Sequence, residues 1–262
     1  KGDTQLRRGR RRRRLAVIRS GNQVMASILV NAIYEMRNYP VVLLNTVLSP
    51  LSFLVLIFLI SDGALLGEAI LGGLIMSMFQ SGISLQTDLS HLKNDFKLQE
   101  IVVSSPTRPS IYVAGMALSE IIYSSPAIII LAILFAISIH VPFIQVAGIV
   151  LVLLMVFLSS VALSFALATI STDIVQSYSF SRLITILLTS LAPVYYPITL
   201  IPEPLQFLAY LSPTTYAAQL AQHLGGLTQV SPDMFIFDWA VLMVFTTVFL
   251  WAGIRKARWR DV

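Results

Sequence analysis

The 262-residue sequence contains no cysteine and few charged residues. The absence of cysteine excludes disulfide bonds, thiolate catalysis, iron–sulfur clusters and cysteine-based zinc sites. Charged residues make up 12% of the chain, about half the share found in an ordinary soluble domain, and apolar residues make up 56%. A cytosolic globular protein of this length could not bury so much apolar sequence. The composition therefore predicts a polytopic membrane protein.

The motifs of common catalytic sites are missing as well. No glycine precedes a lysine, so the P-loop motif is absent, and we expect that this chain does not bind nucleotide through a P-loop and is not an enzyme. There is no H-E-x-x-H motif, and His91, His140 and His223 fall on different sides of the predicted membrane, so no metal site is expected. The many serines are expected to pack or to bond to the backbone rather than to act as nucleophiles.

Six apolar segments are long enough to predict membrane-spanning helices. Only helices and closed barrels satisfy every backbone hydrogen bond in lipid, and these segments lack the strict alternation of barrel strands. The expected fold is therefore an all-α polytopic membrane protein with six transmembrane helices. These are expected at Val41–Ile60, Ala69–Leu85, Ile111–Ile139, Phe143–Ile170, Ile174–Tyr195 and Phe235–Ile254.

The positive charges are distributed unevenly around these segments. Ten Lys and Arg residues lie before the first span, three after the second, one after the fourth and four after the sixth, which accounts for all eighteen. Because Lys and Arg favour the cytoplasmic side, we expect an even number of spans and two cytoplasmic termini. The basic ends, residues 1–22 and 255–262, favour anionic lipid as a partner over nucleic acid.

Three further segments are not simple spans. Residues 23–40 alternate apolar and polar side chains at helical spacing, which predicts a helix lying in the membrane interface. Residues 88–106 form a polar cytoplasmic insertion with an apolar stripe, which either covers the ends of the spans or docks on a partner protein. The outer segment 195–232 is apolar and rich in proline, so we expect it to fold back into the outer leaflet or over the bundle. A plain lid without a transport role is the alternative for this outer segment.

Glu120 and Arg182 are ionisable residues inside predicted spans, where charge is costly and often functional. Glu120 lies about three turns into the third span and Arg182 about two turns into the fifth. They either form an ion pair between helices or line a translocation path. With so few charges in the spans, a transporter coupled to protons or ions would lack its usual relay.

The order of these elements resembles a known family. An interfacial helix ends in Glu35-Met36-Arg37-Asn38-Tyr39-Pro40, and Glu100 lies six residues before Pro106 in the cytoplasmic insertion. The outer segment runs from Ala192-Pro193-Val194-Tyr195-Tyr196-Pro197 to Leu211-Ser212-Pro213-Thr214-Thr215-Tyr216. Together these features resemble the ABC-2 type permeases, the membrane subunits of ATP-driven exporters. The resemblance covers residues 23–255.

The resemblance implies that residues 88–106 form a coupling helix in a cleft of a separate ATPase subunit, which would bind the ATP and Mg. Residues 23–40 would form a connecting helix that also meets the ATPase. The implied contacts are Asp88, Lys93, Asp95, Phe96, Glu100, Pro106, Glu35 and Arg37. In the family an acidic–aromatic pair is often followed by Gly, whereas Lys97 follows here, so this turn departs from the pattern.

The resemblance also implies re-entrant helices over residues 195–224 that close the outer mouth. The implied outer gate consists of Tyr195, Tyr196, Pro197, Pro213 and Tyr216. Two permease copies, identical or related, and two ATPase copies would make the working unit in a prokaryotic plasma membrane. Its path would follow the permease dimer interface, built largely from the first, second and fifth spans.

The expected function is export of an amphipathic, drug-like or lipid-linked substrate from the cytoplasm or inner leaflet by alternating access. The apolar, weakly charged spans favour such a cargo. Candidate lining residues are the aromatic Phe53, Phe58, Phe79, Tyr178 and Phe180, although aromatics in spans more often pack or face lipid. An ATP-independent carrier or channel is the alternative. An intramembrane enzyme is a third hypothesis, for which no nucleophile or metal constellation is present.

Overall fold

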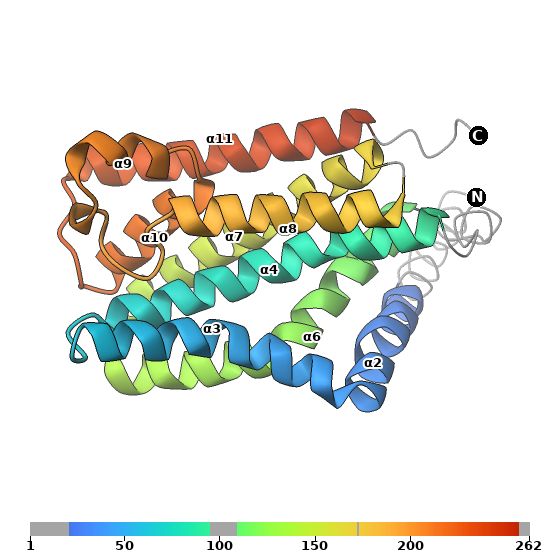
Figure 1. The fold of residues 1–262 in the computed structure, drawn as a ribbon, viewed down its shortest axis with the longest axis horizontal. Helices are drawn as coiled ribbons and strands as arrows, with labels where there is room; N and C mark the ends of the chain where they lie inside the picture. The colour runs from blue at the N-terminus through green and yellow to red at the C-terminus, as the bar shows by residue number, and fades with distance from the viewer. Residues whose placement is uncertain (1–20, 95–108, 172, 257–262) are drawn as a thin grey trace, which may run out of the picture.

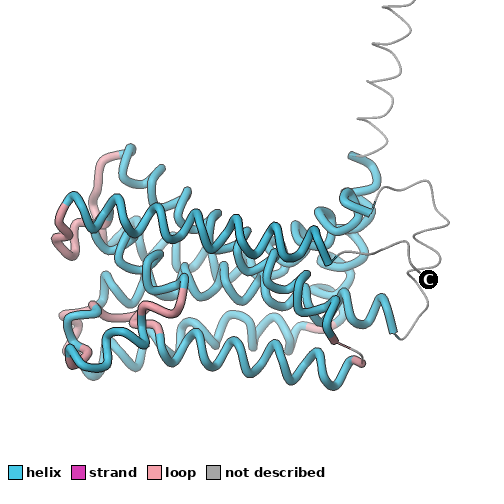
Figure 2. Tube along the Cα trace, turned by 90° about the horizontal axis from the view of Figure 1, so that it is seen from above, coloured by secondary structure: helices cyan, strands magenta, loops and turns pink. Residues whose placement is uncertain are grey.

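The computed structural model describes residues 21–94, 109–171 and 173–256, and within these ranges the chain forms helices and no strands. Long helices run from one end of a bundle to the other, and the connecting loops gather at its two ends (Figures 1 and 2). The long helices are α3 (Pro40–Ile60), α4 (Leu66–Asn94), α6 (Pro109–Ser138), α7 (Phe143–Ile170), α8 (Ile174–Leu191) and α11 (Pro232–Lys256). The short helices are η1 (Leu29–Ile33), α2 (Tyr34–Asn38), η2 (Ile198–Leu200), α9 (Glu203–Ala209) and α10 (Pro213–Leu224). The all-α prediction is confirmed.

In the described part of the chain, four helices are long and apolar enough to cross a membrane. These are Leu66–Ser90, Ala114–Ser138, Phe143–Ala168 and Pro232–Ala252. The first and fifth predicted spans correspond to α3 and α8, which are not among the four. The apolar part of α3 is the shorter stretch Thr46–Ile60. Helix α8 has 18 residues and includes Gln176, Arg182 and several serines, which lower its hydropathy.

Helix α4 lies at the centre of the bundle (Figure 1). It packs against α3, α6, α7, α8 and α10. Of its spanning segment 83% is buried inside the protein, compared with 17% for the spanning segments of α6 and α11. It is also the least hydrophobic of the four spanning helices. Because neighbouring helices surround it, α4 can carry polar side chains that lipid would not tolerate.

Those polar side chains form hydrogen bonds to α7 and α8. The buried Gln86 amide donates to the Ser177 carbonyl at 3.1 Å and accepts from the Ser181 hydroxyl at 2.6 Å. One turn further along α4, the Ser90 and Ser177 hydroxyls lie 2.6 Å apart. On the α7 side, the Ser164 hydroxyl donates to the Gly82 carbonyl at 2.6 Å. These bonds fix the position of α4 between its neighbours.

Two glycines allow other backbones to approach α4 closely. A Cβ atom at Gly82 would collide with the Ser160 side chain and lie 2.9 Å from the Val161 nitrogen on α7. A Cβ atom at Gly72 would lie 2.5 Å from the Val194 carbonyl oxygen. Small residues bring membrane helices into van der Waals contact in this way. The close packing around α4 therefore depends on these two positions having no side chain.

The segment predicted to lie in the membrane interface is helical, as residues 21–28, η1 and α2. It lies across the end of the bundle at which α11 ends (Figure 1). Its buried Ala32 and Ser27 face the bundle, where Gly115 of α6 comes close to Ser27. Large apolar side chains such as Met25 and Tyr34 are exposed. An exposed apolar surface on a helix across the bundle end is typical of a segment in the membrane interface.

One predicted boundary is wrong. The change from apolar to polar composition predicts that a span ends at Leu85 and a separate helix begins at Asp88, whereas α4 continues without a break from Leu66 to Asn94. No glycine or proline lies between Leu85 and Asn94 to end the helix. Residues 95–106 of the predicted coupling helix lie outside the described residues.

The contact at Gly82 leads to a stability prediction. Substitution Gly82→Ala should force α4 and α7 apart and cost about 1–3 kcal/mol of stability, because the added methyl group meets backbone as well as a side chain. The melting temperature of the detergent-solubilised protein measures this loss.

The matched control is Gly21→Ala, since a Cβ atom there has no neighbour within 4 Å. That change should leave the melting temperature unchanged or raise it slightly, because alanine favours the helix. Equal melting temperatures for the two variants would contradict the close approach of α4 and α7.

Candidate functional site

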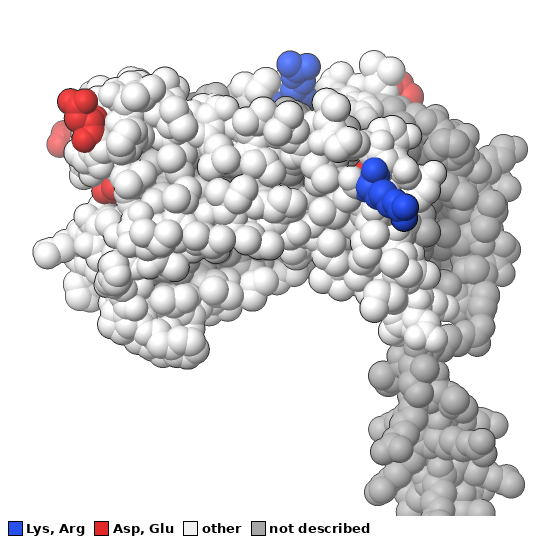
Figure 3. Space-filling view, turned by 90° about the horizontal axis from the view of Figure 1, so that it is seen from below, with Lys and Arg blue, Asp and Glu red and all other residues white. Residues whose placement is uncertain are grey.

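Candidate functional residues gather at both ends of the bundle. At the end that we name the α2 end, α2 leads into α3, and η1 packs on α6 (Figure 1). At the opposite end, which we name the α10 end, α9 and α10 cover the long helices. The surface between the ends carries few charged side chains on the face shown in Figure 3.

Three carboxyl groups from different helices come together at the α2 end: Glu35 of α2, Asp88 of α4 and Glu120 of α6. The Ser84 hydroxyl donates to Glu120 Oε2 at 2.5 Å, and Glu120 also shares a hydrogen bond with Asp88. Partial burial of its carboxyl group raises the pKa of Glu35, and nearby Asp88 raises it further. The structure thus links two predicted coupling residues, Glu35 and Asp88, to the predicted path residue Glu120.

The proposed ion pair between Glu120 and Arg182 does not form. Glu120 is bonded to Ser84 and Asp88 instead, and Arg182 is exposed on α8. An ion pair was one of two alternatives for these residues, and a role in lining a translocation path was the other. However, α6 and α8 lie against different sides of α4 and make no extensive contact.

The other predicted coupling residues are only partly covered by the structure. Arg37 is exposed in the last turn of α2. The backbone of Lys93 belongs to the last turn of α4. The remaining predicted contacts, Asp95, Phe96, Glu100 and Pro106, lie outside the described residues.

At the α10 end, α10 is buried over most of its length, from Pro213 to Gln222. It packs against α4, α7 and α11. Its polar side chains find partners nearby: Thr215 donates to the Ala209 carbonyl, and the Tyr216 hydroxyl donates to the Tyr210 carbonyl at 2.9 Å. Burial raises the pKa of Tyr216, and nearby Asp238 adds to the shift. The Tyr216 hydroxyl therefore keeps its proton, and can donate a hydrogen bond, to a higher pH than a tyrosine in water.

An aromatic cluster surrounds Tyr216. Its ring lies 5.8 Å from that of Tyr210, 6.2 Å from Phe237 and 6.3 Å from Phe245, measured between centroids. Tyr210 belongs to the segment before α10, and the two phenylalanines belong to α11. Aromatic pairs at these distances contribute beyond their buried area, so Tyr216 joins α10 to both flanking segments.

Asp238 is a functional candidate that the sequence analysis missed. It lies in α11 with only 1% of its surface exposed. With its amide nitrogen turned toward this carboxylate, Gln219 of α10 donates to both oxygen atoms at 3.2 Å. Asp238 falls inside the apolar stretch 235–254, so the costly position of a charge within a span was the available signal.

The predicted gate residues Tyr195, Tyr196 and Pro197 lie in the segment that links α8 to η2. The backbone at Val194 and Tyr195 rests against Gly72 of α4. The Tyr195 ring stacks on Phe53 of α3, with centroids 5.2 Å apart. Tyr196 and Pro197 are half-buried. The structure therefore joins a predicted gate residue to a predicted lining residue.

The candidate lining residues separate into two groups. Phe53, Phe58 and Tyr178 are exposed on α3 and α8, and Phe180 is half-buried. Phe79 is 1% exposed and belongs to the hydrophobic core. Its side chain packs in the core, because other helices enclose most of the spanning segment of α4.

The sequence matches a known protein family. A family model described as "ABC-2 type transporter" matches residues 4–224. A comparison with curated proteins gave no match. The matched range includes the α2 end and the whole of α10.

The pair of Asp238 and Gln219 leads to a prediction about α10. Substitution Asp238→Ala leaves the buried Gln219 amide without its acceptor, which should cost about 1–3 kcal/mol. It should also loosen α10. A cysteine introduced at the buried Ala221 reports this, because the chain has no other cysteine. Its reaction with a maleimide should be faster in the D238A background.

The control for this experiment is Asp233→Ala, which removes an exposed carboxylate from the first turn of the same helix. It should leave the labelling rate of the Ala221→Cys protein unchanged. Similar labelling rates in the D238A and D233A backgrounds would mean that Asp238 does not hold α10.

The raised pKa of Glu35 leads to a prediction about pH dependence. The folded protein keeps the Glu35 proton to a higher pH than the unfolded chain, so this group stabilises the fold most below its usual value of 4.5. That contribution is lost as the pH rises through the raised pKa. As the pH rises from about 4 to about 8, the melting temperature of the wild type should therefore fall more than that of E35Q.

Glu203→Gln provides the charge-matched control, since Glu203 is exposed at the start of α9. Its pH profile should follow that of the wild type. A profile of E35Q that is parallel to the wild-type profile would be the contrary result.

Proposed function

Because the chain belongs to the ABC-2 type transporter family, we propose that it is the permease of an ATP-driven exporter. A separate ATPase subunit would bind ATP and Mg and hydrolyse the ATP, since this sequence has no P-loop motif. The observation that carries the proposal is the position of α4. This helix runs from the α10 end to the α2 end of the bundle. Its last residues, 88–94, are also the first residues of the predicted coupling segment.

In this proposal α3 and α8 also cross the membrane, which gives six spans and two cytoplasmic termini. With 21 and 18 residues they are about 31 Å and about 27 Å long, close to the roughly 30 Å of the hydrocarbon core. Ser177 and Ser181 of α8 bond to Gln86 inside the bundle, so much of its polarity is turned away from lipid. The side-dependent distribution of Lys and Arg supports the same topology.

The proposed coupling runs through α4 as a rigid element. Closure of the ATPase subunits would move residues 95–106, which follow directly after α4. Since α4 carries Asp88 at one end and contacts the Tyr195 backbone at Gly72 near the other, its motion would reach both the connecting helix and the outer segment. Small shifts of packed helices can switch such bundles between two arrangements. The permease would alternate between inward and outward access.

Helices α3 and α8 are the proposed surface for a second permease copy or a related chain. Both present large apolar side chains outward, including Leu44, Leu56 and Phe58 of α3 and Val175 and Leu183 of α8. An amphipathic cargo suits a path along this surface, because Tyr178, Phe53 and Arg182 offer aromatic and polar contacts beside apolar ones.

The experiment that tests this proposal begins with purification of the full chain in mild detergent from its host. Mass spectrometry should identify a stoichiometric P-loop ATPase, and the complex should hydrolyse ATP. A preparation without such a partner that still moves solute into liposomes would overturn the proposal and favour an ATP-independent carrier or channel.

A substitution in the predicted coupling helix tests the route of coupling. Glu100→Arg should leave the chain folded but lower ATPase turnover in the complex several-fold, because it reverses the charge of a predicted contact. The control is Glu203→Arg, which makes the same change at the α10 end. If both variants show wild-type turnover, residues 88–106 do not dock on the ATPase.

A further inference from the structure

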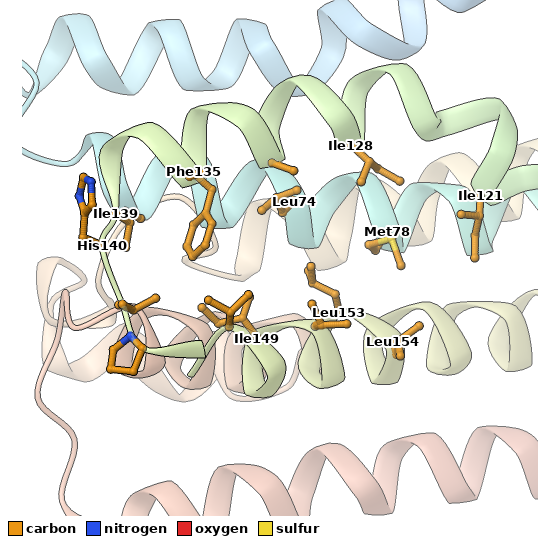
Figure 4. Close-up of a pocket in the computed structure, with 16 residues that line it drawn as sticks. Leu74, Met78, Ile121, Ile128, Phe135, Ile139, His140, Ile149, Leu153 and Leu154 are labelled. Carbon is orange, nitrogen blue, oxygen red and sulfur yellow. The ribbon is translucent and has the colours of Figure 1, made fainter. Parts of the chain in front are cut away.

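A groove separates two helices that follow one another in the chain. Helix α6 ends at Ser138 and α7 begins at Phe143, yet both pack extensively against α4 and hardly at all against each other. The space between them measures about 920 Å³ and is partly open to the outside of the bundle. Figure 4 shows side chains from α6 and α7 pointing into this space from opposite sides.

The walls of the groove are almost entirely apolar. Leu74 and Met78 of α4 form its floor, Phe135 and Ile128 belong to the α6 wall, and Ile149 and Leu153 belong to the α7 wall (Figure 4). The one polar side chain among its lining residues is His140, in the loop between the two helices. A groove of this composition offers almost no hydrogen bonds to water or to a polar substrate.

The groove is long enough to hold an acyl chain from one leaflet of a bilayer. Along α7 its lining extends from Pro142 to Leu154, about 18 Å, and along α6 from Ile121 to Ile139, about 27 Å at 1.5 Å per residue. Half of a hydrocarbon core is about 15 Å. Since most of the α6 and α7 spanning segments is not buried by protein, the groove faces the surrounding lipid.

The proline in α6 beside the groove leaves no carbonyl group without a donor. Pro126 interrupts α6 near the end of the groove that lies away from His140. A proline frees the carbonyl group four residues earlier, and the Ser125 hydroxyl donates to that carbonyl, of Ile122, at 2.7 Å. The hydrogen bonding of the Ile122 carbonyl in α6 is therefore satisfied while α6 and α7 stand apart. The groove walls still lack dispersion partners on one side, and a flexible hydrocarbon chain would supply them.

We propose that this groove binds one acyl chain of a membrane phospholipid, with the lipid headgroup beside His140. The site is separate from the transport path proposed along α3 and α8. The inference requires only that the chain is embedded in a bilayer, so it does not depend on the ATPase. The bound chain would hold α6 and α7 at a fixed spacing around α4.

The test uses the full chain in liposomes with a phospholipid that carries a diazirine on one acyl chain. After irradiation, mass spectrometry of the peptides should show labels concentrated on the lining residues of α6 and α7. Native mass spectrometry in detergent should show one retained phospholipid per chain. Excess unlabelled phospholipid should compete with the labelling.

Substitution Ala136→Trp fills the groove from the α6 wall and should reduce both signals several-fold. The matched control is Ile137→Trp, since Ile137 is the next residue along the helix, is 67% exposed and does not line the groove. Equal melting temperatures would show that both variants fold. If Ala136→Trp does not fold, the smaller Ala132→Phe takes its place.

Labels spread evenly over α6 and α11, or labelling of the groove that Ala136→Trp does not change, would overturn the proposal. Crosslinks from the groove to a second copy of the chain would also overturn it, in favour of a protein interface. Because no ATPase is present in this assay, its failure leaves the exporter proposal untouched.

Discussion

The structure depends on one constraint: a polar helix inside a membrane protein must find its hydrogen-bond partners within the protein, because lipid offers none. Helix α4 meets this constraint through Gln86 and Ser90, which bond to α8, and through the Gly82 carbonyl, which accepts from α7. These bonds require short distances between helices, and Gly72 and Gly82 make the short distances possible. The other long helices are arranged around α4, and their outward faces are free to be apolar.

The same constraint operates at the two ends of the bundle. At the α2 end, Glu120 obtains a donor from Ser84 and a second contact from Asp88. At the α10 end, Asp238 is matched with Gln219. Each of these two carboxyl groups therefore joins two segments that are distant in sequence. Since an unmatched buried charge is costly, these contacts favour one arrangement of α6 relative to α4 and one of α10 relative to α11.

Much of the fold could be predicted from the sequence, because apolar runs and their periodicity report which segments prefer lipid to water. The helical character of residues 41–60, 111–139 and 143–170 follows from that signal. The end of the second long helix was misplaced, because a change from apolar to polar composition at Leu85 does not break a helix when glycine and proline are absent. Helix α8 carries a weaker signal, since its serines serve hydrogen bonds within the bundle.

The sites were less predictable than the helices. That Asp238 is costly in a span is visible in the sequence, but its partner Gln219 lies on another helix and is set by packing. For the same reason the partners of Glu120 and the core position of Phe79 could not be read from residue type. The groove between α6 and α7 has no local signature at all, since it arises from how both helices pack on α4.

The partners of α4 have a consequence for how the protein is made. Gln86 bonds to Ser177, which lies 91 residues further along the chain. At roughly 5–20 residues per second, ribosomes need about 5–18 s to synthesise that distance. During this interval α4 has left the ribosome while the helix that completes its hydrogen bonds does not yet exist. Until α8 arrives, Gln86 must therefore form its hydrogen bonds with other groups, and the second half of the chain completes the packing of a helix in the first half.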